Sequence, residues 1–132
     1  MIAKVLSPND VGETGAHQAG ILIPKVEEIL NYFPPLDKKV KNPSVFISFT
    51  DESGEKWKFR FIYYNNKFFG GTRNEYRLTH MTKFFKVKNL KERDKINFFK
   101  EDELFRIKHE RESKIQKDYI KLSDSWITVK LK

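Results

Sequence analysis

The sequence predicts a mainly β domain, built as an antiparallel barrel or sandwich with two short helices. Seven or eight short stretches of strand-like residues follow one another at regular spacing, separated by turn signals. Aromatic residues, mostly Phe, make up 14% of the 132 residues, which favours a β-rich interior with large side chains. Helical periodicity is confined to two short segments. The chain length and its 39% hydrophobic content predict one domain over residues 1–132 with a substantial buried core.

The first third predicts two strands and a helix. Residues 2–6 alternate imperfectly as a strand, and a Ser-Pro-Asn-Asp turn over 7–10 ends it. Residues 21–23 form a short buried strand. Proline is well placed at a helix start, so Pro24 and the apolar spacing that follows predict a helix over 25–33, which two prolines at 34–35 stop.

The middle of the chain predicts a hairpin. Residues 44–50 alternate as a strand, a turn follows over 51–54, and residues 55–64 return. The returning strand places four aromatic residues on one face: Trp57, Phe59, Phe61 and Tyr63. Its other face carries Lys56, Lys58 and Arg60, which are either solvated or lie along a phosphate track.

The last half predicts short strands and one helix. The helix is expected over 81–87, and the highly charged segment 110–118 is either loop or a helical turn. The strands are expected over residues 75–79, 95–99, 104–109, 119–122 and 126–131.

Several classes of site are excluded or disfavoured. Without cysteine there is no disulfide scaffold and no cysteine-liganded zinc, and a cytoplasmic location is compatible. No apolar run approaches the roughly 20 residues of a membrane helix, and residues 1–6 are too short for a signal peptide. The three histidines lie on separate elements, so no metal and no cofactor are expected.

No convincing active site is present, so this chain is not expected to be an enzyme by itself. It lacks a phosphate-cradling glycine loop and a nucleophile turn. Asp94 with Glu112-x-Lys114 imitates the metal-binding pattern of nucleases, but a third of the residues are charged and chance matches to so loose a pattern are expected.

The positive charge is concentrated in the middle third. The net charge is +8, and residues 56–100 alone carry 13 Lys/Arg against 3 Asp/Glu, a balance of +10. An uneven excess of this kind is how a phosphate-binding surface appears in a sequence.

Two polar, glycine-containing segments are predicted to project from the strands: the first arm, residues 7–20, and the second arm, residues 66–77. In the first arm His17 and Gln18 are candidate base readers, since neither is needed to make a turn. Asn9 and Asp10 either read bases or bond their own backbone to hold the turn.

The second arm carries a denser set of candidates. Arg73 is suited to a bidentate contact with guanine, and Asn74 and Glu75 to adenine and cytosine edges. Arg77 either reads a base, bonds a phosphate or forms an ion pair with Glu75. Candidate contacts to the DNA backbone, which position without specifying sequence, are Lys4, Thr14, Lys25, Lys67, Thr72 and Lys83.

Sequence-specific binding of duplex DNA is therefore the leading hypothesis. The alternative is single-stranded nucleic acid or RNA binding by an OB-like barrel, with Tyr63, Tyr64, Phe68 and Phe69 as stacking platforms.

The two arms and their flanks resemble the N-terminal effector domain of EcoRII-type restriction endonucleases, over about residues 4–80. The matching segments are Leu6-Ser7-x-Asn9-Asp10-x-Gly12-x-Thr14-Gly15-x-His17-Gln18-x-Gly20, Ile23-Pro24, Asn42-Pro43-Ser44-Val45-Phe46, Ile62-Tyr63-Tyr64-Asn65 and Phe69-Gly70-x-Thr72-Arg73-Asn74-Glu75-x-Arg77-Leu78-Thr79. The stretch 87–98 more loosely resembles plant B-three DNA-binding domains.

The resemblance implies a seven-stranded open β-pseudobarrel with two short helices, whose arms grip the DNA major groove. It also implies a bacterial cytoplasmic role in a type II restriction system, either as the effector domain of a longer endonuclease or as a specificity subunit with a nuclease partner. The chain departs from the family at Ala16, which replaces a glycine, and at Glu13, which adds a negative charge beside the expected DNA face.

Overall fold

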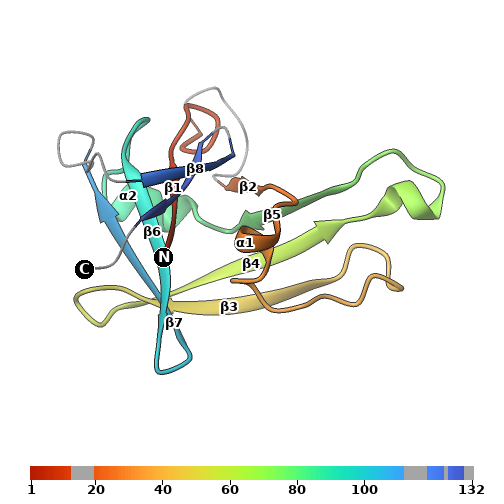
Figure 1. The fold of residues 1–132 in the computed structure, drawn as a ribbon, viewed down its shortest axis with the longest axis horizontal. Helices are drawn as coiled ribbons and strands as arrows, with labels where there is room; N and C mark the ends of the chain where they lie inside the picture. The colour runs from red at the N-terminus through yellow and green to blue at the C-terminus, as the bar shows by residue number, and fades with distance from the viewer. Residues whose placement is uncertain (13–19, 112–118, 124, 130–132) are drawn as a thin grey trace.

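A computed structural model describes residues 1–12, 20–111, 119–123 and 125–129. Within them, nine strands form one strongly curled sheet in the order β2-β5-β4-β3-β7-β6-β1-β9-β8 (Figure 1). The strands are β1 (Ile2–Val5), β2 (Ile21–Ile23), β3 (Ser44–Thr50), β4 (Lys56–Tyr64), β5 (Glu75–Thr79), β6 (Lys95–Glu101), β7 (Leu104–Glu110), β8 (Tyr119–Ser123) and β9 (Trp126–Val129). The helices are α1 (Glu27–Leu30), α2 (Thr82–Val87) and the 3-10 turn η1 (Asn66–Phe69). The mainly β prediction is confirmed, although the sheet has nine strands rather than seven.

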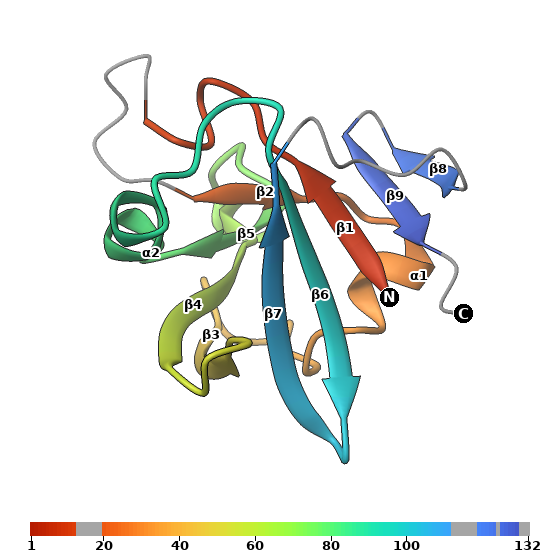
Figure 2. The same cartoon turned by 90° about the vertical axis from the view of Figure 1, so that its left-hand side faces the viewer.

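The sheet is antiparallel except where β3 and β7 meet in parallel at Thr50 and Arg106. The predicted hairpin is confirmed by the β3–β4 register, which runs from Ser44 opposite Ile62 to Thr50 opposite Lys56. Figure 2 shows β7, β6, β1 and β9 side by side in the other half of the curl. The regular alternation of apolar and polar residues determines these faces, since successive side chains of a strand point to opposite sides.

Helix α1 is much shorter than the predicted helix over 25–33. Val26 has an extended backbone (φ −105°, ψ 129°), so the helix begins at the next residue. Beyond the helix, the amides of Tyr32 and Phe33 donate to carbonyls three residues back, the bonding of a tight 3-10 turn. Ile29 and Phe33 are nevertheless buried. The apolar spacing therefore predicted which side chains face the core, but it did not predict the length of the helix.

A stack of aromatic rings runs through the core toward the second arm. Ring centroids lie 4.6 Å apart between Phe33 and Phe61, 5.7 Å between Phe61 and Tyr76, and 4.1 Å between Tyr76 and Tyr63. Stacked rings of this kind contribute about 0.5–1.5 kcal/mol per pair beyond the area that they bury. The stack gives β4 and β5 a rigid base from which the second arm extends.

The two ends of the curled sheet approach each other across a seam. The indole Nε1 of Trp126 on β9 donates to the carbonyl of Leu22 on β2 at 3.2 Å. Trp126 is buried and stacks on Phe98 at 5.9 Å. The seam thus joins the C-terminal strand β9 to β2, the strand that follows the first arm. Among the described residues, no helix has the length and apolar character that crossing a bilayer requires.

Candidate nucleic-acid interface

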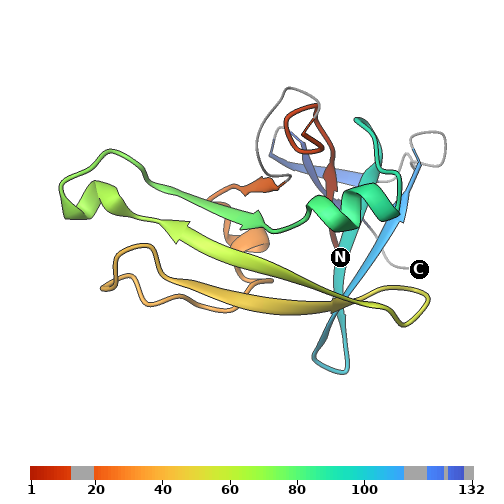
Figure 3. The ribbon, with the colours of Figure 1, turned by 180° about the vertical axis from the view of Figure 1, so that it is seen from behind.

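The two arms are attached to neighbouring strands. The first arm lies between β1 and β2, and the second arm leads from β4 into β5. Strands β2 and β5 pair directly, with Leu22 opposite Arg77. Figures 1 and 3 show the β4–β5 hairpin extending well beyond the rest of the sheet, with η1 at its end. The pairing therefore places the bases of two segments distant in sequence beside each other.

A cavity of about 340 Å³ lies where the two arms meet the sheet. Its lining comes from both arms and from the C-terminal strands: Lys4, Ser7, Asn9, Asp10, Leu22, Pro24, Arg77, Ser123, Ser125 and Trp126. Asn9 of the first arm and Arg77 of the second arm thus face one concavity. Sequence analysis missed Ser123, Ser125 and Trp126 as part of this surface, because the β8–β9 turn carries no motif and reaches it only through the seam.

Three charged residues of the second arm form a row along β5 and the segment just before it. Arg73 Nε donates to Glu75 Oε1 at 2.6 Å, and Arg77 Nη1 lies 3.7 Å from Glu75 Oε2. These side chains are 30–45% exposed. Exposed ion pairs are worth only about 0–1 kcal/mol. The row can therefore exchange its internal contacts for contacts to a ligand at small cost, and the predicted ion pair between Arg77 and Glu75 is present.

Tyr64 supports the first member of this row. The guanidinium carbon of Arg73 lies 3.6 Å from the centroid of the Tyr64 ring. Tyr64 and Glu75 are opposite each other in the β4–β5 ladder, so ring and carboxylate hold the guanidinium together. Glu75 engages Nε, which leaves the Nη1/Nη2 fork as the edge suited to a bidentate acceptor.

Asn74 is partly committed to the scaffold. Its Oδ1 accepts a hydrogen bond of 2.6 Å from the buried hydroxyl of Tyr63. Burial, with a smaller contribution from Tyr63, raises the pKa of Tyr76. A bidentate contact with adenine needs both the oxygen and the nitrogen of the Asn74 amide. Reading adenine would therefore require the bond from Tyr63 to be released.

Asp10 and Lys4 form a buried ion pair at the base of the first arm. Lys4 Nζ lies 3.0 Å from Asp10 Oδ2, with the side chains 6% and 8% exposed. The same carboxylate accepts from the backbone N–H of Ser7 at 2.9 Å, and Lys4 Nζ also donates to Ser125 Oγ. These contacts support the scaffolding role of Asp10. The ammonium group of Lys4 is buried and engaged in these contacts, which argues against the phosphate contact predicted for it.

Of the remaining first-arm residues predicted to contact DNA, only Asn9 lies within the described residues. Asn9 is exposed and is followed by Gly12 at φ +80°, a backbone conformation that glycine adopts without strain. The amide of Gly12 donates to the carbonyl of Asn9 at 3.2 Å, which shapes the bend. Thr14, His17 and Gln18 lie outside the described residues, so their roles stay predictions.

The candidate phosphate contacts are not all brought to the arms. Lys67 and Thr72 are exposed on the second arm, and Lys25 is exposed next to Pro24, which lines the cavity. Lys83 is exposed on α2, at the opposite end of β5 from the tip of the second arm. Lys67 and Thr72 thus share the second arm, Lys25 follows a residue that lines the cavity, and Lys83 lies apart from them.

Only part of the proposed stacking platform is exposed. Tyr63 is buried and Tyr64 lies under Arg73. Phe68 and Phe69 on η1 are 66% and 43% exposed. Two of the four rings are therefore unavailable to successive bases of a single strand, which weakens the alternative of an OB-like binder.

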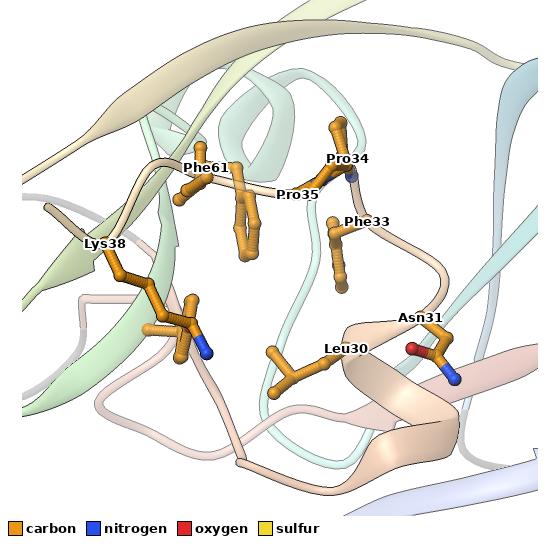
Figure 4. A pocket seen from close by; sticks show the side chains of 9 residues that line it. Leu30, Asn31, Phe33, Pro34, Pro35, Lys38 and Phe61 are labelled. Atoms are coloured by element: carbon orange, nitrogen blue, oxygen red, sulfur yellow. The ribbon is translucent and has the colours of Figure 1, made fainter.

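A second cavity, of about 380 Å³, opens on the inner side of the sheet (Figure 4). Its lining is mainly apolar and comes from α1, the segment after it and the core rings: Leu30, Asn31, Phe33, Pro34, Pro35, Leu36, Lys38, Phe61 and Tyr76. Tyr76 lines it while Arg77 lines the cavity between the arms, because successive residues of β5 point to opposite faces. None of the candidate DNA-contacting residues that the structure describes lines this second cavity.

The nuclease-like pattern gains no support from its one described member. Asp94 is buried, and its Oδ2 accepts from Arg111 Nη1 at 2.8 Å and from the backbone N–H of Lys91 at 2.9 Å. Glu112 and Lys114 lie outside the described residues. Over the part of the chain that the structure describes, no three His, Asp or Glu side chains cluster as metal ligands would.

Comparison with known proteins agrees with the curled sheet and its arms. The family model described as "Restriction endonuclease EcoRII, N-terminal" matches residues 1–95. The chain belongs to the EcoRII-N family. The resemblance inferred from the two arms is thereby confirmed.

Relatives of this EcoRII-N domain occur in bacteria and plants. The type II restriction enzyme EcoRII of Escherichia coli is 44% identical over 81 residues, which are 58% of this chain and 19% of that enzyme. A B3 domain-containing protein of Oryza sativa subsp. japonica is 32% identical over 99 residues, 74% of this chain and 28% of the plant protein. The chain therefore spans less than a third of the curated relatives it matches.

A solved structure supports the fold of this EcoRII-N domain. The protein in the Arabidopsis FUS3–DNA complex superposes with a TM-score of 0.65 and 20% sequence identity, over 83% of this chain and 94% of that chain. The likeness covers most of both chains. It confirms the B-three-like pseudobarrel predicted from the resemblance.

Proposed function

We propose that this EcoRII-N domain binds a short specific sequence of double-stranded DNA, with both arms in the major groove. The observation that carries the proposal is the shared concavity, in which Asn9 of the first arm faces the same space as Arg77 of the second. The charge of residues 56–100 would attract the phosphates. The proposal is also supported by the family and by a DNA complex among its structural neighbours.

Base reading would centre on Arg73, Glu75 and Arg77. The two arginines offer hydrogen-bond donors, and Glu75 between them offers acceptors. Base pairs in the major groove are distinguished by such a pattern of donors and acceptors. Asn9 and Asn74 would add amide contacts. His17 and Gln18 are proposed readers as well, together with phosphate contacts from Thr14, Lys25, Lys67, Thr72 and Lys83.

We place the domain in a bacterial, cytoplasmic type II restriction system, where it would direct a nuclease domain or subunit to its site. The proposal is supported by the E. coli relative, of which the matched stretch is 19%. No catalytic role is proposed for the residues of this chain.

The test begins with selection of bound duplexes from a random pool, followed by measurement of Kd for the selected site and for a scrambled duplex. In Arg73→Ala we expect the preference for the selected site to fall by about 5- to 150-fold, the range of 1–3 kcal/mol for one bidentate contact. Arg73→Lys is the matched control, because it keeps the charge and loses the fork.

Arg73→Lys should lose the same preference as Arg73→Ala while retaining nonspecific affinity. Equal loss of specific and nonspecific binding in Arg73→Ala, with both retained in Arg73→Lys, would show that Arg73 touches only phosphate. A wild-type domain that selects no sequence from the pool would overturn the proposed function as a whole.

A further inference from the structure

The tip of the second arm exposes two adjacent aromatic side chains. Three aromatic residues are prominent among the exposed hydrophobic side chains of the described residues: Phe46, Phe68 and Phe69. The last two lie together on η1, at the far end of the β4–β5 hairpin (Figures 1 and 3). Phe68 is 66% exposed and Phe69 43%. We call these two residues the aromatic tip.

The aromatic tip is held by a dense set of backbone hydrogen bonds. Lys67 N–H donates to the Arg73 carbonyl at 2.9 Å, and Gly71 N–H donates to the Asn66 carbonyl at 2.7 Å. Gly70 takes φ +89°, so the chain turns sharply directly after Phe69. The rings are therefore presented by a defined turn.

The base of the tip is anchored to the body of the domain. Asn65 is fully buried, its Oδ1 accepts from the amide of Asn42 at 2.7 Å, and its Nδ2 donates to the Val40 carbonyl at 2.9 Å. A rigid apolar surface loses little entropy on binding. The tip is thus suited to a contact of fixed geometry.

The charge around the tip indicates what covers it. Lys67 directly precedes Phe68 in the chain, and Arg73 follows the rings just before β5, all within a segment whose charge balance is +10. A partner must therefore be negatively charged overall and yet offer an apolar group. Duplex DNA combines both, since the one apolar group that base pairs present in the major groove is the C5-methyl of thymine.

We propose that Phe68 and Phe69 contact thymine C5-methyl groups in the major groove and so determine part of the sequence preference. This inference rests on the proposed function, because the tip reaches the bases only if the second arm enters the groove. The apolar contact would complement the polar row of Arg73, Glu75 and Arg77, adding selection for A·T pairs at the edge of the site.

The test removes one methyl group at a time from the DNA. Each thymine of the selected duplex is replaced by deoxyuridine, which keeps base pairing and lacks only the C5-methyl, and Kd is measured by fluorescence anisotropy. In the wild type we expect at least one replacement to weaken binding by about three- to tenfold, the scale for burying one methyl-sized group against an aromatic ring.

The same duplexes are then measured with the double variant Phe68→Ala/Phe69→Ala. We expect it to bind the thymine and deoxyuridine duplexes equally well at the responsive position. The matched control is Phe46→Ala, which removes a ring that is 52% exposed on β3, away from the arms. This control should keep the wild-type response to deoxyuridine.

Three outcomes would overturn the inference: a selected site without thymine, a wild-type domain indifferent to every deoxyuridine, or a response that persists in the double variant. None of these outcomes contradicts the proposed function, provided that Arg73→Ala still loses the preference for the selected duplex over the scrambled one. If the wild type prefers single-stranded oligonucleotides and only the double variant loses that binding, the tip is a stacking platform and both proposals fail.

Discussion

The guanidinium carbon of Arg73 lies 3.6 Å from the centroid of the Tyr64 ring, so the best candidate for base reading is oriented before any DNA arrives. Glu75 holds the same group from the side through Nε at 2.6 Å. Side-chain ordering is a cost of association, about 0.5–1.5 kcal/mol for each long side chain that becomes fixed. Because Tyr64 and Glu75 already hold Arg73 in place, less side-chain entropy is lost on binding than for an unsupported arginine.

Removing the ring should weaken specific binding modestly. For Tyr64→Leu we expect a two- to fivefold loss of affinity for the selected duplex, corresponding to ~0.5–1 kcal/mol for an exposed cation–π contact. The measurement is Kd for selected and scrambled duplexes. Tyr64→Phe is the control, because it keeps the ring face and should bind as the wild type does. A Tyr64→Leu variant that weakens both duplexes equally would contradict a positioning role.

Salt dependence should reveal which lysines meet phosphate. Each phosphate contact contributes a slope of about −0.9 to the plot of log affinity against log salt concentration. Lys67→Ala should therefore make the slope shallower by roughly one contact. Lys100→Ala is the control, since Lys100 is exposed next to the β6–β7 turn. Figure 1 shows that turn well away from the tip of the β4–β5 hairpin. Equal slopes for Lys67→Ala and the wild type would remove Lys67 from the interface.

The buried pair of Lys4 and Asp10 should stabilise the fold. Removing one partner leaves an unpaired buried charge, so Asp10→Ala should lower the free energy of unfolding by about 3–5 kcal/mol. Urea denaturation measures this loss. The double variant Lys4→Met/Asp10→Leu should regain much of it, because no charge then remains buried without its partner. A stable Asp10→Ala protein with altered base preference would instead restore the reading role of Asp10.

Asp51 should make stability depend on pH in the acid range. Burial alone raises the pKa of Asp51, but hydrogen bonds from Trp57 Nε1 and Lys88 Nζ, together with those from Ser53 and the Glu55 amide, outweigh it and lower the pKa well below its ordinary value. The folded protein therefore holds this carboxylate ionised where the unfolded chain would protonate it. Its contribution is present above the unfolded pKa of about 4 and is lost as pH falls toward the folded pKa.

Asp51→Asn should lower the free energy of unfolding at pH 7 by about 1–3 kcal/mol and flatten its dependence on pH below about 5. Denaturant titrations between neutral pH and about pH 2.5 measure both effects. Glu52→Gln is the control, because Glu52 is exposed beside Asp51 and should leave the profile unchanged. An Asp51→Asn protein with the wild-type pH profile would show that another carboxylate governs acid stability.

Local sequence patterns predicted most of the strands and the two arms. The alternation of Trp57, Phe59 and Phe61 with lysines reports a strand with one buried face, since side chains of a strand point alternately to its two sides. The arms were identified by polar and glycine residues at characteristic spacing, and they led to the family. The length of α1 could not be read in this way, because apolar spacing records burial and leaves the end of a helix to local backbone bonds.

The sequence by itself determined the class of fold, the family, the basic middle third and the residue types that the arms present. Only the tertiary structure decided which of those residues are free to act. It buries Lys4 against Asp10, lays Arg73 over Tyr64, and brings Trp126 to Leu22 across 104 residues of chain. The physical reason is that charge and periodicity are local properties of a chain, whereas pairing and burial depend on how distant strands meet around one core.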